Sequence, residues 1–330
     1  ILKDMDYVKS TNLYGNKAHP YDEKVYTPQG LKKWKDVKIG DELFNTYGGI
    51  TKVIDIPFDN KTDIYEITLK DGRKIKASSN HLWVVTDWNN YTKVLSTVDI
   101  QKNYFRNKGK YKEFKYYIPS NKGVEYEKQD INIDPYTLGI LIGDGSLSKV
   151  RRNVVSFASN LEDVKTYKKE CPYEFTKPSD DRHMYIRIKN IGNHLENLKL
   201  KGTKSRTKFI PDIYKYTTRK IRLSILHGLF DTDGTVGYGG NPEYCSTSLR
   251  LAEDVLEVAR SLVINGNLNS VVNKFGKVYK VRLYTDIKLF KLYRKSIKQK
   301  ITKTRSKKTA IVNIKYLYND NNLSFREIIN

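Results

Sequence analysis

Two apolar stretches of the sequence each end in an acidic residue that is followed by glycine. The first reads TLGILIGDG over residues 137–145, and the second reads LHGLFDTDG over residues 226–234. The apolar runs predict two buried helices, and each helix is expected to stop at its Asp-Gly pair. This repeated element constrains the fold more than any other feature, because one chain must accommodate the same buried helix twice.

Residues before the two stretches are suitable helix starts. Asp134 is a good N-cap, and Pro135 then occupies the first helical position, where a missing N–H costs no hydrogen bond. Thr217 and Thr218 are candidate caps for the second helix. We therefore expect both helices to begin at defined residues.

Small residues four positions apart allow the two helices to approach closely, because they share one helix face. The pairs are Gly139 with Gly143, and Ser224 with Gly228. Packing on these faces would bring Asp144 and Asp233 side by side, which is costly unless a metal neutralises them. Paired carboxylates suit magnesium and phosphodiester hydrolysis. The alternative is a pair of buried helices with purely structural stops.

The sequence that follows each stretch also repeats. GDGSL precedes VSFASNLEDVKTYKK, and TDGTV precedes YCSTSLRLAEDVLEVAR. The offset of about 90 residues is typical of a duplicated α/β subdomain and too long for a solenoid unit. Alternating segments predict antiparallel hairpins in both halves: NVVSFAS with MYIRIKN, and NSVVNKF with KVYKVRLYT around a turn at Gly276.

Composition indicates a nucleic-acid partner. The 330 residues carry a net charge of +23 and include 25 tyrosines, which suits contacts to phosphates and base edges. Two cysteines, Cys171 and Cys245, predict a reducing compartment with no disulfide framework. The sequence shows no secretion signal and no apolar run of membrane-spanning length, so we expect neither secretion nor a membrane partner. Because the chain begins with Ile, we expect a fragment or a trimmed form.

The two stretches resemble the paired motifs of LAGLIDADG homing endonucleases, and the second matches nearly letter for letter. The resemblance implies a pseudo-two-fold αββαββα domain that makes a site-specific double-strand break in DNA by divalent-metal-dependent phosphodiester hydrolysis. It implies Mg²⁺ as the cofactor, with Mn²⁺ as a substitute. It also implies a monomer that acts on a long, partly pseudo-symmetric double-stranded target.

The same resemblance assigns roles to individual residues. Asp144 and Asp233 are expected to be catalytic and to bind the metal, together with the residues that precede them, Gly143 and Thr232. In related endonucleases a lysine lies near the metals.

Two lysines are candidates for that role. Lys208, in KSRTKFIPDIY, matches the family's lysine block, and Lys303 occupies a roughly equivalent place in the second half. Such a lysine could polarise the attacking water or hold a phosphate oxygen. The alternative for both is a surface lysine, since lysines are abundant throughout the chain. Residues 288–308 are rich in basic residues and contain no acidic one.

A second resemblance covers the N-terminal region. TPQGLKKWKDVKIGDELFN and the later NHLWVV resemble the first part of a Hint (intein) splicing domain. Ser78 and His81 fit that family's Thr-x-x-His block with serine in place of threonine. The imidazole could donate to the amide nitrogen of the scissile peptide. Ala18 occupies the nucleophile position.

Alanine cannot perform the acyl shift, because it carries no nucleophile. Either a cysteine was replaced at position 18, or the chain resembles the inteins that begin with alanine. Residues 1–17 are then interpreted as a lead-in or a remnant of a host extein in cis. Residues 304–330 are expected to return into the Hint domain, with the final splicing block absent.

Residues 96–130 are rich in Lys and Tyr and are interpreted as a linker or a DNA-recognition arm. Basic side chains there would contact phosphates, and basic side chains of the predicted hairpins would enter the major groove. The predicted DNA-binding residues are Arg106, Lys108, Lys110, Lys112, Lys115, Arg187, Lys189, Lys280 and Arg282.

Together these features predict a multi-domain α+β protein. An all-β Hint splicing domain at residues 18–95 would be interrupted by an endonuclease domain at 131–303, with halves at about 131–215 and 216–303. Splicing by this chain is expected to be impaired. The alternatives are a splicing element with a decayed endonuclease and a non-cleaving DNA-binding protein of the same fold. We expect the protein in the cytoplasm, or wherever its host acts on nucleic acid.

Overall fold

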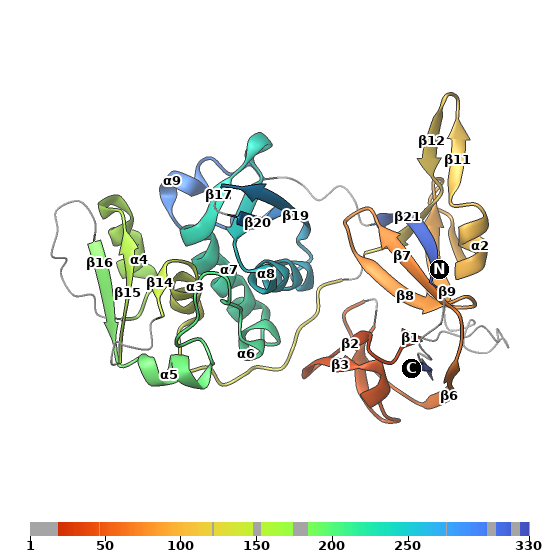
Figure 1. Cartoon of the computed structure of the whole chain (residues 1–330), viewed down its shortest axis with the longest axis horizontal. Coiled ribbons are helices and arrows are strands. Elements are labelled where there is room, and N and C mark those ends of the chain that lie inside the picture. Colours follow the sequence, from red (N-terminus) through yellow and green to blue (C-terminus); the bar gives the residue numbers. More distant parts are fainter. Residues whose placement is uncertain are drawn as a thin grey trace. The chain divides into compact units, whose positions relative to one another are not determined.

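The chain forms two compact units (Figure 1). Unit 1 comprises residues 1–27, 31–121 and 306–330, and unit 2 comprises residues 28–30 and 122–305. The computed structural model describes residues 19–45, 47–120, 122–147, 153–173, 184–274, 276–301, 308–317 and 324–329.

Unit 1 is built mainly from β-strands. A six-stranded antiparallel sheet has the order β10-β9-β13-β21-β7-β8. Its strands are β7 (Ile64–Leu69), β8 (Lys74–Ser78), β9 (Leu82–Asp87), β10 (Thr92–Ser96), β13 (Tyr116–Pro119) and β21 (Lys308–Leu317). The strand predicted at IVNIKYL is therefore present as β21, where it lies between β13 and β7.

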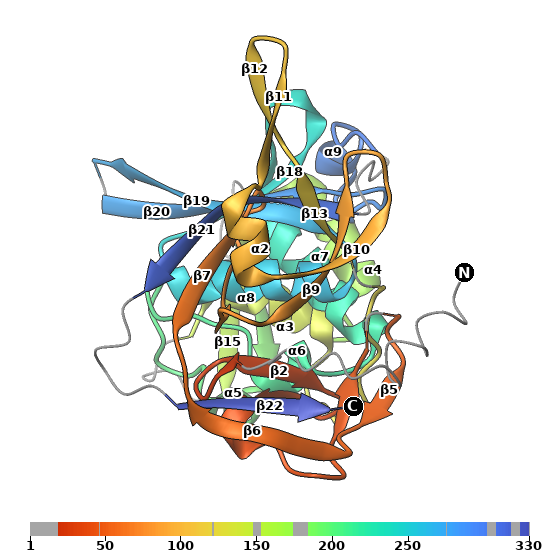
Figure 2. The same cartoon turned by 90° about the vertical axis from the view of Figure 1, so that its right-hand side faces the viewer.

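Smaller sheets complete unit 1. Strand β22 (Ser324–Ile329) lies between β1 (His19–Pro20) and β6 (Asp55–Lys61). Figure 2 shows β22 beside β6. Three two-stranded sheets pair β2 (Lys24–Thr27) with β3 (Gly30–Lys33), β4 (Glu42–Phe44) with β5 (Ile50–Lys52), and β11 (Phe105–Lys108) with β12 (Tyr111–Phe114).

Residues 96–119 do not form a simple linker. Helix α2 (Thr97–Lys102) begins at Ser96, whose side chain accepts a hydrogen bond from the Asp99 amide. Strand β13 belongs to the six-stranded sheet. Between them, the β11–β12 hairpin projects from unit 1 (Figure 1). Ile100, Tyr104, Tyr116 and Ile118 pack into the core of unit 1, so these parts of the segment belong to the fold of that unit.

Unit 2 contains both predicted apolar helices. The first half holds α3 (Pro135–Gly143), β14 (Gly145–Ser146), β15 (Val154–Ser159), α4 (Val164–Glu170), β16 (Met184–Lys189), α5 (Gly192–Asn197) and α6 (Asp212–Lys215). The second half holds α7 (Arg219–Asp233), β17 (Gly234–Val236), β18 (Pro242–Ser246), α8 (Leu249–Ser261), β19 (Asn265–Asn273), β20 (Gly276–Tyr284) and α9 (Tyr293–Ser296).

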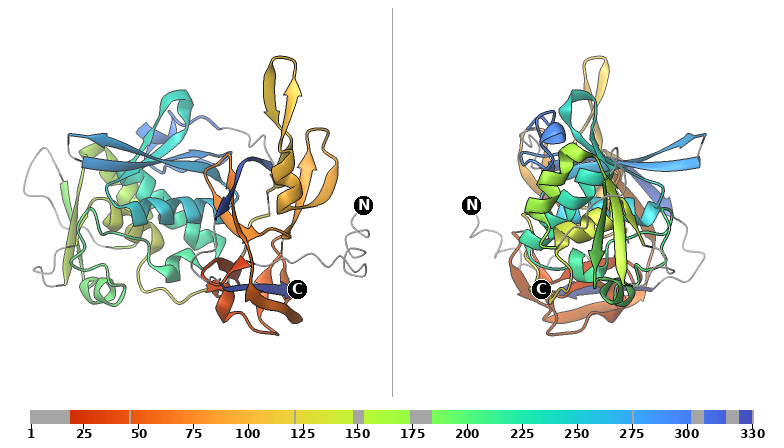
Figure 3. Two further views of the ribbon diagram at one scale, coloured as in Figure 1. Left: turned by 45° about the vertical axis from the view of Figure 1, so that its right-hand side comes forward. Right: turned by 90° about the vertical axis from the view of Figure 1, so that its left-hand side faces the viewer.

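Each half of unit 2 has its own antiparallel sheet. Strands β14, β15 and β16 are adjacent in the first half (Figure 3), and the second half has the order β17-β18-β20-β19. The registers match at the helix ends, since Gly145 faces Phe157 and Gly234 faces Tyr244. Both halves therefore place a strand directly after the apolar helix.

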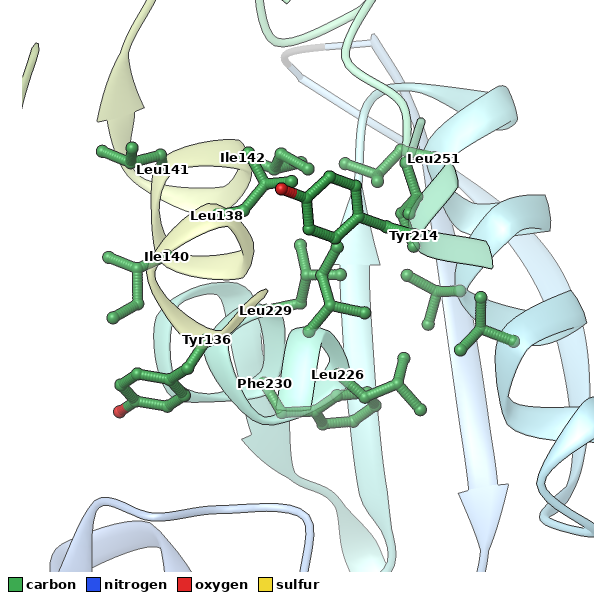
Figure 4. Close-up of a cluster of buried hydrophobic side chains, with 14 of the residues drawn as sticks. Tyr136, Leu138, Ile140, Leu141, Ile142, Tyr214, Leu226, Leu229, Phe230 and Leu251 are labelled. Atoms are coloured by element: carbon green, nitrogen blue, oxygen red, sulfur yellow. The ribbon is translucent and has the colours of Figure 1, made fainter. Parts of the chain in front are cut away.

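Helices α3 and α7 pack side by side at the centre of unit 2 (Figure 4). Gly139 and Gly228 allow the close approach: a Cβ at Gly139 would lie 2.9 Å from the Leu229 amide nitrogen, and one at Gly228 would lie 2.9 Å from the Ile140 amide nitrogen. Any side chain at either glycine would force the backbones apart. Leu138, Ile140, Leu226 and Leu229 of the same helices are fully buried.

The helix starts agree in part with the sequence. Asp134 caps α3 by accepting a hydrogen bond of 2.8 Å from the Thr137 amide, with Pro135 at the first helical position. Thr218 is the N-cap residue of α7, but its side chain makes no capping bond. The Thr217 hydroxyl instead accepts a hydrogen bond from the Gln129 amide. Thr218 therefore occupies the predicted cap position, but its hydroxyl does not satisfy an amide of α7.

The predicted fold class is confirmed as a mixed α and β protein, while the duplicated αββαββα arrangement and the Hint architecture remain predictions. One detail departs from an all-β splicing domain, because α2 lies within unit 1. In the described ranges, no helix is both long enough and apolar enough to cross a membrane.

Candidate active site

Asp144 and Asp233 occupy equivalent positions in the two halves of unit 2. Asp144 is the C-cap of α3, and Asp233 is the last residue of α7. Both residues keep part of their surface open to solvent, although protein surrounds much of each carboxyl group and the helices that carry them are buried. The glycines that follow are required, because a Cβ at Gly145 or Gly234 would overlap the helix backbone one turn earlier.

The two carboxyl groups influence each other. Burial by the surrounding protein raises the pKa of Asp233 to about 6, and the nearby charge of Asp144 raises it further, while two lysines oppose the shift. Burial also raises the pKa of Asp144, and Lys208 and Lys295 again oppose this. The pair is thus a concentrated negative site that favours a cation.

Lys208, the lysine that the family resemblance suggested for the metal site, lies beside Asp144. Its ammonium donates hydrogen bonds to the carbonyl oxygens of Gly143, at 2.6 Å, and Gly145, at 3.3 Å. These are the two residues that flank Asp144. Burial lowers the pKa of Lys208, and the carboxylates of Asp233 and Asp144 oppose that effect.

Lys295 occupies the equivalent place beside Asp233, and the sequence reasoning missed it. Its ammonium donates to the carbonyl oxygens of Thr232, at 2.9 Å, and Gly234, at 2.7 Å, which flank Asp233. It also donates to the carbonyls of Phe230 and Asp231. Burial is the main cause that lowers the pKa of Lys295, and the positive charge of Arg294 lowers it further.

The predicted second lysine, Lys303, lies outside the described residues. A spacing signal in the sequence could have indicated Lys295 instead. Lys208 follows Asp144 by 64 residues (208 minus 144), and Lys295 follows Asp233 by 62 (295 minus 233), whereas Lys303 follows by 70 (303 minus 233).

Oxygen ligands for a divalent ion are available at this site. The Asp144 and Asp233 carboxylates are hard donors, and the carbonyl oxygens of Gly143 and Thr232 each keep a second lone pair beside their lysine bond. The described residues contain no group of three or more His, Cys, Asp or Glu side chains that could hold a metal. Two carboxylates suit Mg²⁺, which usually takes its remaining ligands from water and substrate phosphates.

The first acidic residue of the second stretch, Asp231, has a structural position. Its buried carboxyl accepts a hydrogen bond of 2.7 Å from the Tyr136 hydroxyl and bonds from the amides of Lys291 and Leu292. These amides directly precede α9, which carries Lys295. Asp231 therefore anchors the chain segment that places the second lysine.

The two halves differ at one position next to the carboxylates. Tyr244 is fully buried and faces Gly234, whereas Phe157 faces Gly145 in the first half. Among the described residues, the Tyr244 hydroxyl has no partner with hydrogen-bond geometry. It is still close enough to Asp233 to oppose the rise in the pKa of that carboxyl. The surroundings of the two aspartates are thus not identical.

The predicted DNA-binding residues of the arm lie on the β11–β12 hairpin and directly after it. Lys108, Lys110 and Lys112 are exposed, and Lys115 is partly buried. Arg106 pairs with Glu113 at 2.6 Å, and its guanidinium lies over the Trp88 ring. Lys108 shares the same glutamate at 2.9 Å.

The predicted DNA-binding residues of unit 2 are exposed on the two sheets. Arg187 and Lys189 flank the buried Ile188 on β16, so both lie on the outer face. Lys280 and Arg282 flank the buried Val281 on β20 in the same way. Arg282 donates to Glu243 on the neighbouring strand at 2.6 Å, which fixes its guanidinium in place.

The predicted splicing residues of unit 1 are buried near one another. Ser78 ends β8 and is fully buried, and the amide of His81 donates to its carbonyl oxygen. The His81 ring contacts the rings of His19 and Trp83, each with 4.5 Å between centroids. Ala18, at the nucleophile position, lies outside the described residues.

His19 received no role from the sequence but is central to this cluster. Its ring stacks on Trp34 with 4.7 Å between centroids, and its Nδ1 donates to the carbonyl oxygen of Lys76 at 2.9 Å. Burial lowers the pKa of His19 from 6.5 to about 4, while the bond to Lys76 opposes this. The imidazole is therefore neutral at physiological pH.

We expect unit 1 to lose stability as the pH falls from about 6.5 to about 4. The folded pKa of His19 lies below the unfolded value, so between pH 6.5 and pH 4 the unfolded chain binds a proton at this imidazole that the folded chain does not. Protonation of the unfolded chain lowers the free energy of unfolding over this range, and the loss levels off below the folded pKa. The loss approaches about 3 kcal/mol in the free energy of unfolding. Urea denaturation followed by tryptophan fluorescence reports on unit 1, since Trp34, Trp83 and Trp88 all belong to it.

A His19→Gln variant should show a flatter dependence over the same pH range, because its side chain does not titrate. If the free energy of unfolding changed equally with pH in the variant and the unmodified chain, His19 would not be the group that causes the pH dependence.

Comparison with known proteins gives two sequence matches. Residues 220–330 match the LAGLIDADG-like domain family, and this range includes Asp233 and Lys295. Over 311 residues, the chain is 25% identical to the replicative DNA helicase DnaB of Mycobacterium intracellulare. That alignment covers 85% of this chain and 49% of the helicase, so the chain spans about half the length of the curated relative it matches.

Solved structures of two kinds also resemble parts of the chain. The homing endonuclease I-DmoI in complex with DNA and Ca is 13% identical, with a TM-score of 0.34, and the match covers 50% of this chain and 94% of I-DmoI. The MchDnaB-1 intein is 25% identical, with a TM-score of 0.21, and the match covers 24% of this chain and 58% of that intein.

Proposed function

We propose that this chain, an intein that carries a LAGLIDADG-like domain, cuts both strands of a specific DNA site by divalent-metal-dependent hydrolysis. The observation that carries the proposal is the paired site of Asp144 and Asp233. The two carboxylates end closely packed helices, and a lysine lies beside each of them. The presence of both acids and both lysines in matching positions favours an intact endonuclease over a decayed one.

The residues of the site have distinct tasks in the proposed reaction. Asp144 and Asp233 would hold the metal, and the carbonyls of Gly143 and Thr232 could serve as further ligands. A bound Mg²⁺ ion would neutralise the scissile phosphate and lower the pKa of a water ligand. Lys208 and Lys295 point fixed positive charge at the same place, where charge develops on the phosphate oxygens.

DNA binding draws on the charge of the whole chain. The net charge of +23 supports strong attraction to a polyanion, and Arg187, Lys189 and Lys280 lie exposed on the sheets of unit 2. Phosphate contacts of this kind would fix the position of the protein on the duplex. Contacts from side chains of the same strands to base edges would determine the sequence preference. A chain that carries both halves can act as a monomer on a long, partly pseudo-symmetric duplex.

The test is cleavage of a plasmid that carries the joined coding sequences from either side of the segment that encodes this chain. We expect linear product with Mg²⁺ or Mn²⁺, and none after EDTA removes the metal. DNA bound in Ca²⁺ but never cut in Mg²⁺ would instead favour a decayed enzyme or a non-cleaving DNA-binding protein. A scrambled site in the same plasmid is the control for specificity.

Protein splicing is a second candidate function, favoured by the buried Ser78 and His81 of unit 1. We propose that splicing of this chain is impaired, because Ala18 cannot form the first ester or thioester. In a precursor with host extein sequence in cis, Ala18→Cys should allow cleavage of the 17–18 bond by a thiol reagent. His81→Ala in the same precursor should remove that cleavage. Equal cleavage with and without His81 would reject the splicing role.

A further inference from the structure

A short sequence, Glu-Asp-Val, occurs once in each half of unit 2. It covers residues 162–164 just before and at the start of α4, and residues 253–255 within α8. Its aspartates are buried, at 5% exposure for Asp163 and 5% for Asp254. Neither residue belongs to the paired aspartate site, so the repeat requires a separate explanation.

Asp254, in the second half, anchors the segment of the first half that carries Lys208. One carboxyl oxygen accepts a hydrogen bond of 2.9 Å from the amide of Ile210, two residues beyond that lysine. The other oxygen accepts a hydrogen bond of 2.8 Å from the buried ammonium of Lys215. The hydroxyl of Ser248, the N-cap residue of α8, donates to the carbonyl of Lys208 at 2.8 Å.

Asp163, in the first half, anchors the segment of the second half that carries Lys295. Both of its oxygens accept hydrogen bonds from Arg294, the residue immediately before that lysine, with a closest distance of 2.7 Å. Lys291 also pairs with Glu170 of the first half at 3.3 Å. Bidentate pairing fixes the direction of the Arg294 side chain and hence the placement of α9.

We infer that Asp163 and Asp254 are crossed positioning residues: each holds the active-site lysine that belongs to the opposite half. The inference rests on the proposed function for its catalytic meaning. Each lysine ends at the carbonyls that flank its own aspartate, so a shift of its segment would move one positive charge relative to one scissile phosphate. Cutting of each strand then depends on a contact between the two halves of unit 2.

The experiment compares Asp163→Asn and Asp254→Asn by strand-resolved cleavage of a duplex with different labels on its two strands. We expect each variant to slow mainly one strand, by about tenfold, and the two variants to slow opposite strands. The affinity for DNA in Ca²⁺ should not change. Equal slowing of both strands by either variant would indicate a merely structural role and overturn the inference.

The chain supplies a neighbouring glutamate as a control for each variant. Glu253→Gln removes the exposed glutamate that precedes Asp254 and should cut the two strands at unchanged rates. Glu162 is exposed but also pairs with Arg294 at 3.2 Å, so Glu162→Gln should slow cutting far less than Asp163→Asn, which removes the bidentate partner. If Asp254→Asn fails to fold because Lys215 loses its buried partner, Asp163→Asn decides alone, since its partner Arg294 is 38% exposed. A control that slows one strand as strongly as its neighbouring aspartate variant would also overturn the inference.

A second readout does not depend on cleavage. Acetic anhydride labelling of the DNA-free protein, read by mass spectrometry, measures how well each lysine is held. Asp163→Asn should raise labelling of Lys295 severalfold and leave Lys208 unchanged, and Asp254→Asn should do the reverse. If this pattern appears in a chain that never cuts DNA, the positioning holds and the proposed function fails. Labelling that is unchanged in both variants rejects the positioning itself.

Discussion

Asp233→Asn is expected to bind its DNA target and leave it uncut, with a cleavage rate lower by at least about 10³-fold. Asparagine has the same shape as aspartate but lacks the charge that would hold a divalent ion. Asp144→Asn should have the same effect, because each carboxylate contributes to one paired site. The measurement is single-turnover cleavage with Mg²⁺, beside a gel-shift titration with Ca²⁺.

Loss of folding would not explain this result. The charge of Asp144 raises the pKa of Asp233, so the folded state is strained by two like charges. Removing one of them should leave the thermal midpoint unchanged or slightly higher. Asp286→Asn, at an exposed carboxylate of the same unit, is the control and should cut normally. If Asp233→Asn retained more than a tenth of the cleavage rate, Asp233 would not belong to the active site.

Lys295→Met and Lys208→Met are each expected to lower the cleavage rate by about 10²- to 10³-fold. Both ammonium groups are fixed by backbone carbonyls and face the aspartate pair, so no solvent reorganisation is needed when negative charge develops. Methionine keeps the apolar part of each side chain and removes only the charge. Cleavage rates at saturating DNA isolate this loss from any change in binding.

Lys303→Met tests whether the second active-site lysine is Lys295, as the structure indicates, or Lys303, as the sequence suggested. We expect this variant to retain most of its cleavage rate and to lose only part of its DNA affinity, as for one phosphate contact. If Lys303→Met abolished cleavage while Lys295→Met did not, the second lysine would be the one that the sequence comparison first indicated.

The central helices were predictable because their signals are local. An apolar run, an N-cap such as Asp134, and small residues four positions apart define a helix and its contact face without reference to the rest of the chain. The close approach at Gly139 and Gly228 agrees with that prediction. The positions of Asp144 and Asp233 at the helix ends follow from the same local pattern.

Other features depended on distant residues, and sequence reasoning missed them or assigned them incompletely. Residues 105–119 form a hairpin and a sheet strand, where a linker was one of two interpretations, because their partners include β21, which begins at residue 308. Arg282 was predicted to contact DNA, and the sequence did not indicate that its guanidinium is held by Glu243 on the adjacent strand. Only the register of β18 with β20 brings these two residues together.

The sequence by itself determined the mixed α and β fold class, the two acidic helix ends and the strongly basic charge of the chain. The tertiary structure decided which lysine accompanies Asp233 and what holds it there. Lys295 reaches the site because Asp231 and Asp163 fix the start of α9, and both lie far away along the chain. A spacing pattern can place a residue on its own helix, but a contact between distant segments follows only from how those segments pack.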